Sequence, residues 1–218
     1  MDSKSRKITI IGVLTALCLI SVALVRVPIV MFLKYEPKDV IITIGGLIFG
    51  PAVSFLTSFL SSFLEMFILS DTGVLGFIMN VLASVCFACP AVIIYRKGRS
   101  MKSAILGLLT GAIIMTVVML LWNYIITPIF LKIPREEVVK LLVPAILPFN
   151  MIKSGLNAGF ILLLYNPVVT ALRKRNLVDP SSSTKEEKQR LINLSTLVIA
   201  SIVIASSVLL VMVLRNMI

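Results

Sequence analysis

The run Ile8-Thr-Ile-Ile-Gly-Val-Leu-Thr-Ala-Leu-Cys-Leu-Ile-Ser-Val-Ala-Leu-Val25 is the first of several apolar stretches whose recurrence decides the fold class. A helix of this length can cross the roughly 30 Å hydrocarbon core of a bilayer. No small-residue cleavage site follows the run, so we expect a retained helix rather than a signal peptide. Of the 218 residues, 58% are hydrophobic and the mean hydropathy is +1.05, as is typical of a polytopic membrane protein.

The apolar segments predict an all-α membrane protein with a six-helix core and one additional C-terminal transmembrane helix. The core occupies residues 1–175, a polar cytoplasmic linker follows at 176–190, and the additional helix lies within 191–218. The expected helical segments are 7–25, 39–49, 51–69, 74–95, 102–131, 142–172 and 191–214.

Residues 39–69 admit two interpretations, either two helices separated at Gly50-Pro51 or one long helix kinked by the proline. The basic residues favour two helices. Clusters near residues 4–7, 96–102 and 173–190 all fall on the cytoplasmic side only if this region crosses twice, with the N-terminus cytoplasmic.

Several function classes lose support from composition. The chain has no histidine, which removes the commonest general base and metal ligand. Cys18, Cys86 and Cys89 lie inside apolar runs and are interpreted as packing residues. No nucleophile–base pair is visible, so we expect no enzyme, metal or cofactor. The basic residues responsible for the net charge of +11 flank the membrane spans, so this charge does not predict nucleic-acid binding.

The stretch Leu147-Pro-Phe-Asn-Met-Ile-Lys-Ser-Gly-Leu-Asn157 places Asn150, Lys153 and Asn157 on one face of a membrane helix. A lysine at such a depth needs a partner, a wet cavity or a ligand, unless it snorkels to the interface. At about 1.5 Å per residue, Asn123 lies at the same height as Lys153. We therefore expect a pocket open to the outside.

Other polar and aromatic groups fall near this level, each with a structural alternative. Asn80, like Asn123, could bond a neighbouring helix. Glu65 could pair with Lys153 or serve as a proton site. Trp122, Tyr124 and Phe149 suit either the membrane interface or stacking on a flat ring.

Two further segments complete the candidate regions. The outer loop Phe32-Leu-Lys-Tyr-Glu-Pro-Lys-Asp39 is either a solvated loop or a lid with extended backbone, in which Asp39 caps the next helix. Gly12 and Ala16 form a small-xxx-small pair, which serves internal packing or a partner subunit.

Four motifs make the chain resemble the riboflavin-binding S components of energy-coupling factor (ECF) transporters. They are the outer loop just quoted, Gly46-Leu-Ile-Phe-Gly-Pro51, Trp122-Asn-Tyr124 with Pro128, and Leu147-Pro-Phe-Asn-Met-Ile-Lys153. The resemblance covers residues 1 to about 175, and the seventh span departs from the usual six-helix plan.

The resemblance implies a multi-pass protein of the prokaryotic cell membrane that captures riboflavin from outside. It also implies delivery through a shared transmembrane coupling subunit driven by two ABC ATPases. The residues matched to riboflavin in the resemblance are Asn123, Asn150 and Lys153 at the polar ring edge and Lys34, Tyr35 and Glu36 at the ribityl chain. Gly12 and Ala16 match the docking motif for the coupling subunit.

Two alternatives stay open at this stage. An S component for another vitamin, such as thiamine or folate, would share the architecture. A stand-alone ion-coupled carrier would use a pair between Glu65 and Lys153, although no internal repeat of the kind common in such carriers is evident.

Overall fold

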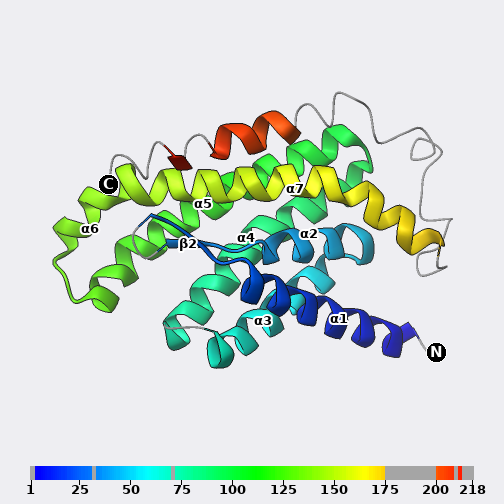
Figure 1. The fold of residues 1–218 in the computed structure, drawn as a ribbon, viewed down its shortest axis with the longest axis horizontal. Helices are drawn as coiled ribbons and strands as arrows, with labels where there is room; N and C mark the ends of the chain where they lie inside the picture. The colour runs from blue at the N-terminus through cyan, green and yellow to red at the C-terminus, as the bar shows by residue number, and fades with distance from the viewer. Residues whose placement is uncertain (1–2, 31–32, 70–71, 175–199, 209–210, 213–218) are drawn as a thin grey trace.

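Long apolar helices account for most of the residues that the computed structural model describes, which are 3–30, 33–69, 72–174, 200–208 and 211–212 (Figure 1). The elements in chain order are α1 (Ser3–Leu24), β1 (Val27–Val30), β2 (Leu33–Tyr35), α2 (Lys38–Phe49), α3 (Pro51–Ile68), α4 (Gly73–Gly98), α5 (Met101–Leu131), α6 (Arg135–Leu141), the π-helical segment η1 (Leu142–Ile146) and α7 (Leu147–Lys174). Residues 200–208 and 211–212 are also helical. The predicted linker 176–190 and the start of the last predicted helix lie outside the described residues.

Five helical segments within the described chain are long and apolar enough to cross a membrane: Lys4–Leu24, Pro51–Ile68, Gly73–Gly98, Met101–Leu131 and Arg135–Leu172. The 12-residue α2 reaches only about 18 Å, too short to span the hydrocarbon core alone. The prediction of an all-α polytopic membrane protein is confirmed.

The junction between α2 and α3 is a sharp turn at Gly50, not a kink within one helix. Gly50 has φ 114°, a conformation that strongly favours glycine. Pro51 then occupies the first turn of α3, where its missing N–H breaks no helical hydrogen bond. The two-helix interpretation of residues 39–69 is therefore correct.

α4 connects the packing of the helices, since it contacts α2 and α3 as well as α5. α1, α2 and α3 pack on one another, and α2 also contacts α4 and α7. α5 packs closely on α4 because Gly107 and Gly111 face backbone carbonyls of α4, where a Cβ would lie 2.7 and 2.2 Å from oxygen. Figure 1 shows α7 along α5 on one side of the molecule and α1 with α3 on the other.

The segment predicted as one helix over 142–172 has an irregular start. α6 runs into the π-helical turn η1, in which the N–H of Leu147 reaches the carbonyl of Leu142. Pro144 and Pro148 lie in and just after this turn, and a proline cannot donate to the regular helical ladder. Such π-turns often accompany functional sites, and α7 begins here.

The predicted outer loop is an antiparallel hairpin, with Val27 opposite Tyr35 and Pro28 opposite Lys34. Leu33 and Tyr35 are buried while Lys34 between them is exposed, the alternation of a strand with one packed face. Leu33 and Tyr35 join a buried cluster with Phe149, Ile152 and Leu156 of α7. The expectation of extended backbone is thus confirmed, with α7 as the surface that the hairpin covers.

Candidate ligand-binding site

A cavity of about 420 Å³ lies between the hairpin, α4, α5 and α7. This volume falls within the range of small-molecule pockets. The lining comes from the segment leading into and along the hairpin (Arg26, Leu33, Lys34, Glu36), from α4 and the residue before it (Thr72, Leu75, Gly76, Met79, Asn80, Ala83), from α5 (Met119, Trp122, Asn123, Ile126, Thr127, Phe130) and from α7 (Phe149, Asn150, Lys153).

The structure brings Asn123, Asn150 and Lys153 together at this cavity, although they come from two different helices. All three are at least 94% buried. Mostly apolar walls with a few polar groups are the composition expected of a site for a flat, partly polar small molecule.

The two amides are oriented by their own helices. Asn123 donates from Nδ2 to the Met119 carbonyl at 2.8 Å, and its Oδ1 accepts from the Thr127 hydroxyl at 2.8 Å. Asn150 donates from Nδ2 to the Ile146 carbonyl of the π-turn at 2.8 Å. An amide has two N–H donors and an oxygen with two lone pairs, so each asparagine keeps hydrogen-bonding capacity for a ligand.

Lys153 is paired with Asp39 and not with Glu65. Its Nζ lies 3.2 Å from Oδ2 of Asp39, which also accepts from Nδ2 of Asn157 at 3.3 Å. The other oxygen, Oδ1, accepts from the Ser84 hydroxyl. Asp39 is fully buried, and these bonds tie α2 to α4 and α7. The prediction that Asp39 caps α2 was wrong, since no side-chain cap bond forms there and the carboxylate points into the bundle instead.

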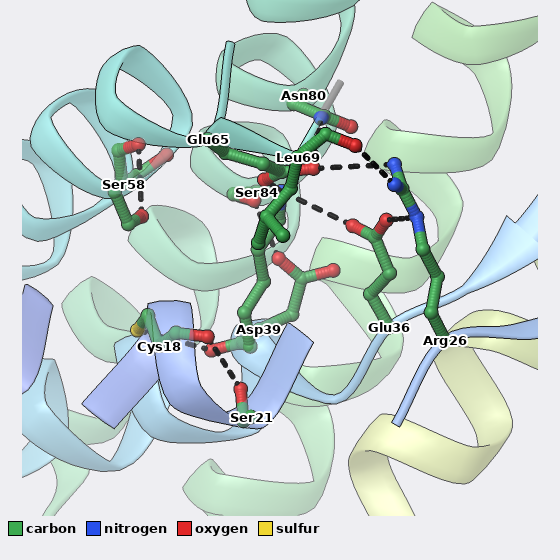
Figure 2. A network of polar contacts seen from close by, with 12 residues as sticks. Cys18, Ser21, Arg26, Glu36, Asp39, Ser58, Glu65, Leu69, Asn80 and Ser84 are labelled. Atoms are coloured by element: carbon green, nitrogen blue, oxygen red, sulfur yellow. Dashed lines mark hydrogen bonds and ion pairs between the residues drawn. The ribbon is translucent and has the colours of Figure 1, made fainter. Parts of the chain in front are cut away.

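A second charge network fastens the hairpin to α3 and α4 (Figure 2). Nε of Arg26 lies 2.8 Å from Oε1 of Glu36, and its Nη2 lies 3.6 Å from Oε1 of Glu65. Nη1 of Arg26 donates to the carbonyl of Leu69 at the end of α3. We call this group, completed by Lys38, the hairpin latch.

Lys38 lies at the centre of the hairpin latch and is 1% exposed. Its Nζ is paired with Oε2 of Glu36 at 3.2 Å and with Oε2 of Glu65. Asn80 donates to the other oxygen of Glu65 at 3.2 Å. Buried charges are tolerated only when they are paired in this way. The charge of the Glu65 carboxylate is thus compensated within the latch, without Lys153.

Two groups of the hairpin segment have shifted pKa values. Burial alone would raise the pKa of Glu36, but the charges of Lys38, Lys153 and Arg26 outweigh burial and the pKa is lowered. Burial, reinforced by the charge of Asp39, raises the pKa of Tyr35, which donates its hydroxyl proton to Oδ1 of Asn157 at 3.1 Å. Glu36 is thus held as an anion and Tyr35 as a neutral donor.

The sequence-predicted site residues fall into four places. Lys34, Glu36, Asn80, Trp122, Asn123, Asn150 and Lys153 line the cavity. Tyr35 is not among the lining residues and is bonded to Asn157 behind the hairpin. Tyr124 is turned away on α5, where the Arg135 guanidinium lies 5.0 Å from its ring centre. Gly12 and Ala16 are exposed on the outer face of α1, far from the cavity lining.

Sequence reasoning missed the residues that hold this site in shape. The predicted outer loop contains Lys38 and ends in Asp39 as a cap, yet both side chains are fully or almost fully buried. The available signal was an adjacent pair of opposite charges at the start of an apolar helix, where unpaired burial would be costly. Among the described residues, no group of three or more His, Cys, Asp or Glu is placed to hold a metal ion.

Comparisons with known proteins agree on one family. The family model described as "ECF transporter, substrate-specific component" matches residues 6–165. The riboflavin transporter FmnP of Bacillus subtilis is 34% identical over 132 residues, covering 56% of this chain and 70% of that protein. The riboflavin transporter RibU of Staphylococcus aureus is 27% identical over 184 residues, covering 80% and 95%.

A solved structure gives the same result. The S component of a bacterial ECF transporter superposes with a TM-score of 0.66 at 26% identity, covering 99% of that chain and 78% of this one. Sequence motifs, cavity and fold thus point the same way, and this chain belongs to the family of substrate-specific components of ECF transporters.

Proposed function

We propose that this membrane protein is the substrate-binding subunit of an ECF-type importer and that its cargo is riboflavin. The observation that carries the proposal is the meeting of Asn123, Asn150 and Lys153 in the lining of one mostly apolar cavity. Both curated relatives described above are named riboflavin transporters, which supports the same cargo. The family consists of transporter components and not of enzymes.

The chemistry of the cavity suits the two halves of riboflavin. A uracil-like ring edge presents carbonyls and an N–H, which amides and an ammonium satisfy together. Trp122 and Phe149, also in the lining, offer aromatic surface to the flat ring. Lys34 and Glu36 of the hairpin segment, also lining residues, would serve the hydroxyls of the ribityl chain, with Tyr35 supporting the hairpin.

The hairpin is the proposed lid. Its buried side chains pack on α7, and the hairpin latch holds its base against α3. Releasing the latch would expose the cavity at the hairpin side, whereas the other walls are continuous helices. We place this mouth on the external face, with the N-terminus of α1 in the cytoplasm, in accord with the positions of the basic clusters.

Energy for uptake would come from partner subunits. We propose a transmembrane coupling subunit and two ABC ATPases as those partners, since this chain carries no GxxxxGK[ST] phosphate-binding loop. Exposed Gly12 and Ala16 on α1 provide a face that a partner helix can approach closely.

The direct test is a fluorescence titration of riboflavin with the purified full-length protein in detergent. We expect saturable quenching of flavin fluorescence at nanomolar to micromolar concentrations. Thiamine and folate added in excess should leave the quenching unchanged. Absence of saturable quenching would refute the proposed cargo, and displacement by either competitor would reassign it.

A further inference from the structure

The described part of the C-terminal helix lies directly on α7, the helix that carries Asn150 and Lys153. A Cβ at Gly155 would lie 2.7 Å from Oγ of Ser207, and one at Gly159 would lie 2.6 Å from Cγ1 of Ile204. Glycine at these two positions favours the observed approach, because a Cβ at either would require the facing side chain to shift. Ala200 and Ser207 are correspondingly buried, whereas Ile202 and Ser206 are exposed. Figure 1 shows the same helix, in red, beside α7 and on the opposite side of the molecule from α1.

α7 faces the cavity on one side and the C-terminal helix on the opposite side. At 100° per residue, Gly155 and Gly159 point away from Asn150, Lys153 and Asn157. The front of α7 therefore meets the cavity and Asp39, while its back meets the C-terminal helix. Ile204 and Val211 also pack against the cluster in which the hairpin meets α7.

α7 needs support at this point because its beginning is irregular. The π-turn η1 precedes it, and Pro148, two residues before Asn150, removes one helical donor. Prolines and π-turns are the sites at which helices usually bend, so a bend here would tilt α7. Tilting would separate Lys153 from Asp39 and Asn157 from Tyr35, two bonds that fix the cavity wall.

We infer that the C-terminal helix is a brace that seats α7 against Asp39 and the hairpin, and that Ser207 and Ile204 are positioning residues for ligand binding. The inference rests on the proposed function for its ligand, riboflavin. The brace is additional to the matched family region, which ends at residue 165. It also leaves the Gly12–Ala16 face of α1 uncovered for a partner.

Adjacent serines provide a matched test in the full-length protein. Each hydroxyl bonds a carbonyl of its own helix, Ser206 that of Ile202 and Ser207 that of Val203, but only Ser207 faces Gly155. Ser207→Leu should weaken riboflavin binding by on the order of tenfold, because overpacking displaces the brace. Ser206→Leu, on the exposed side of the same helix, should bind as the unchanged protein does. Equal affinities in Ser207→Leu and Ser206→Leu would overturn the inference.

A cross-link tests the packing without a ligand and without relying on the folding of Ser207→Leu. In a background with Cys18, Cys86 and Cys89 replaced by alanine, Gly155→Cys with Ser207→Cys should form a disulfide, whereas Gly155→Cys with Ser206→Cys should not. The linked protein should retain riboflavin binding and release the ligand no faster than its reduced form. Failure to cross-link, or equal cross-linking of both pairs, would refute the brace. If the unchanged protein does not bind riboflavin, the proposed cargo fails while the cross-link still decides the packing.

Discussion

Nζ of Lys153 lies 3.2 Å from Oδ2 of Asp39, joining α7 to α2 across the interior of the bundle. The carboxylate is fully buried and the ammonium nearly so. Lys153 therefore has two roles: it lines the cavity, and it joins α7 to α2. Substitutions can separate these roles.

Asp39→Asn should destabilise the protein by about 3–5 kcal/mol, because it leaves the Lys153 ammonium buried without its counter-ion. Thermal unfolding in detergent measures this loss. Glu137→Gln, which breaks the exposed pair of Glu137 with Lys140, should change stability by less than about 1 kcal/mol. The double variant Asp39→Asn/Lys153→Met should recover part of the loss, and no recovery would contradict a direct pair.

Lys153→Met and Asn150→Ala should each weaken riboflavin binding by roughly 10- to 100-fold, since each removes a hydrogen bond to the polar ring edge. Fluorescence titration gives the affinities. For the lysine they are also measured in the double variant Asp39→Asn/Lys153→Met, because Lys153→Met alone leaves the buried Asp39 carboxylate without this counter-ion. Lys140→Met on the exposed surface and Asn166→Ala farther along α7 are the matched controls. Losses of equal size in the controls would show that these effects are not specific to the cavity.

Arg26→Gln should speed riboflavin dissociation, because it removes the cation that joins Glu36 to Glu65 and to the Leu69 carbonyl. Stopped-flow release of the bound flavin measures the rate. Arg135→Gln, which removes the cation beside Tyr124, should release the ligand at the unchanged rate. Identical dissociation rates in both variants would rule out the hairpin latch as the control of release.

Low pH should weaken the ion pairs of the hairpin latch. The pKa of Glu36 is lowered from its ordinary 4.5, so its ion pairs contribute fully to stability above that value and are lost as pH falls below it. Dissociation should therefore accelerate only in acid below pH 4.5, as the pH approaches the lowered pKa of Glu36, and Glu36→Gln should flatten this pH dependence. A variant that keeps the full pH dependence would assign the effect to another group.

Ala16→Trp should abolish transport by cells that express the whole importer while leaving riboflavin binding unchanged, because it fills the exposed small-residue face of α1. Uptake of labelled riboflavin and binding to the purified subunit are the two measurements. Ala205→Trp, on an exposed position of the C-terminal helix, is the control and should transport normally. Loss of binding in Ala16→Trp would contradict a docking role for this face.

Helix positions and the depth of polar groups could be predicted from the sequence because they depend on local rules. Apolar runs gave the helices, and the rise per residue placed Asn123 level with Lys153. The turn at Gly50-Pro51 followed from the charge bias of the loops.

The ion-pair partners of the buried charged side chains could not be predicted, because they depend on how the helices rotate and cross. Glu65 was the candidate partner for Lys153 by height, whereas the packing of α2 against α7 selects Asp39. The π-turn before α7 has no signal beyond its two prolines. The hairpin was expected only as extended chain, since its register depends on contacts with α7.

The latch and Asp39 hold the backbone framework, whereas Trp122, Asn123 and Thr127 belong to the α5 wall of the cavity. Thr127 and Asn123 satisfy each other within α5, so this wall does not bear the ion pairs that keep the bundle assembled. Retargeting the importer to a differently shaped vitamin could therefore proceed by exchanging α5 side chains alone, with the machinery of opening and energy coupling left as it is.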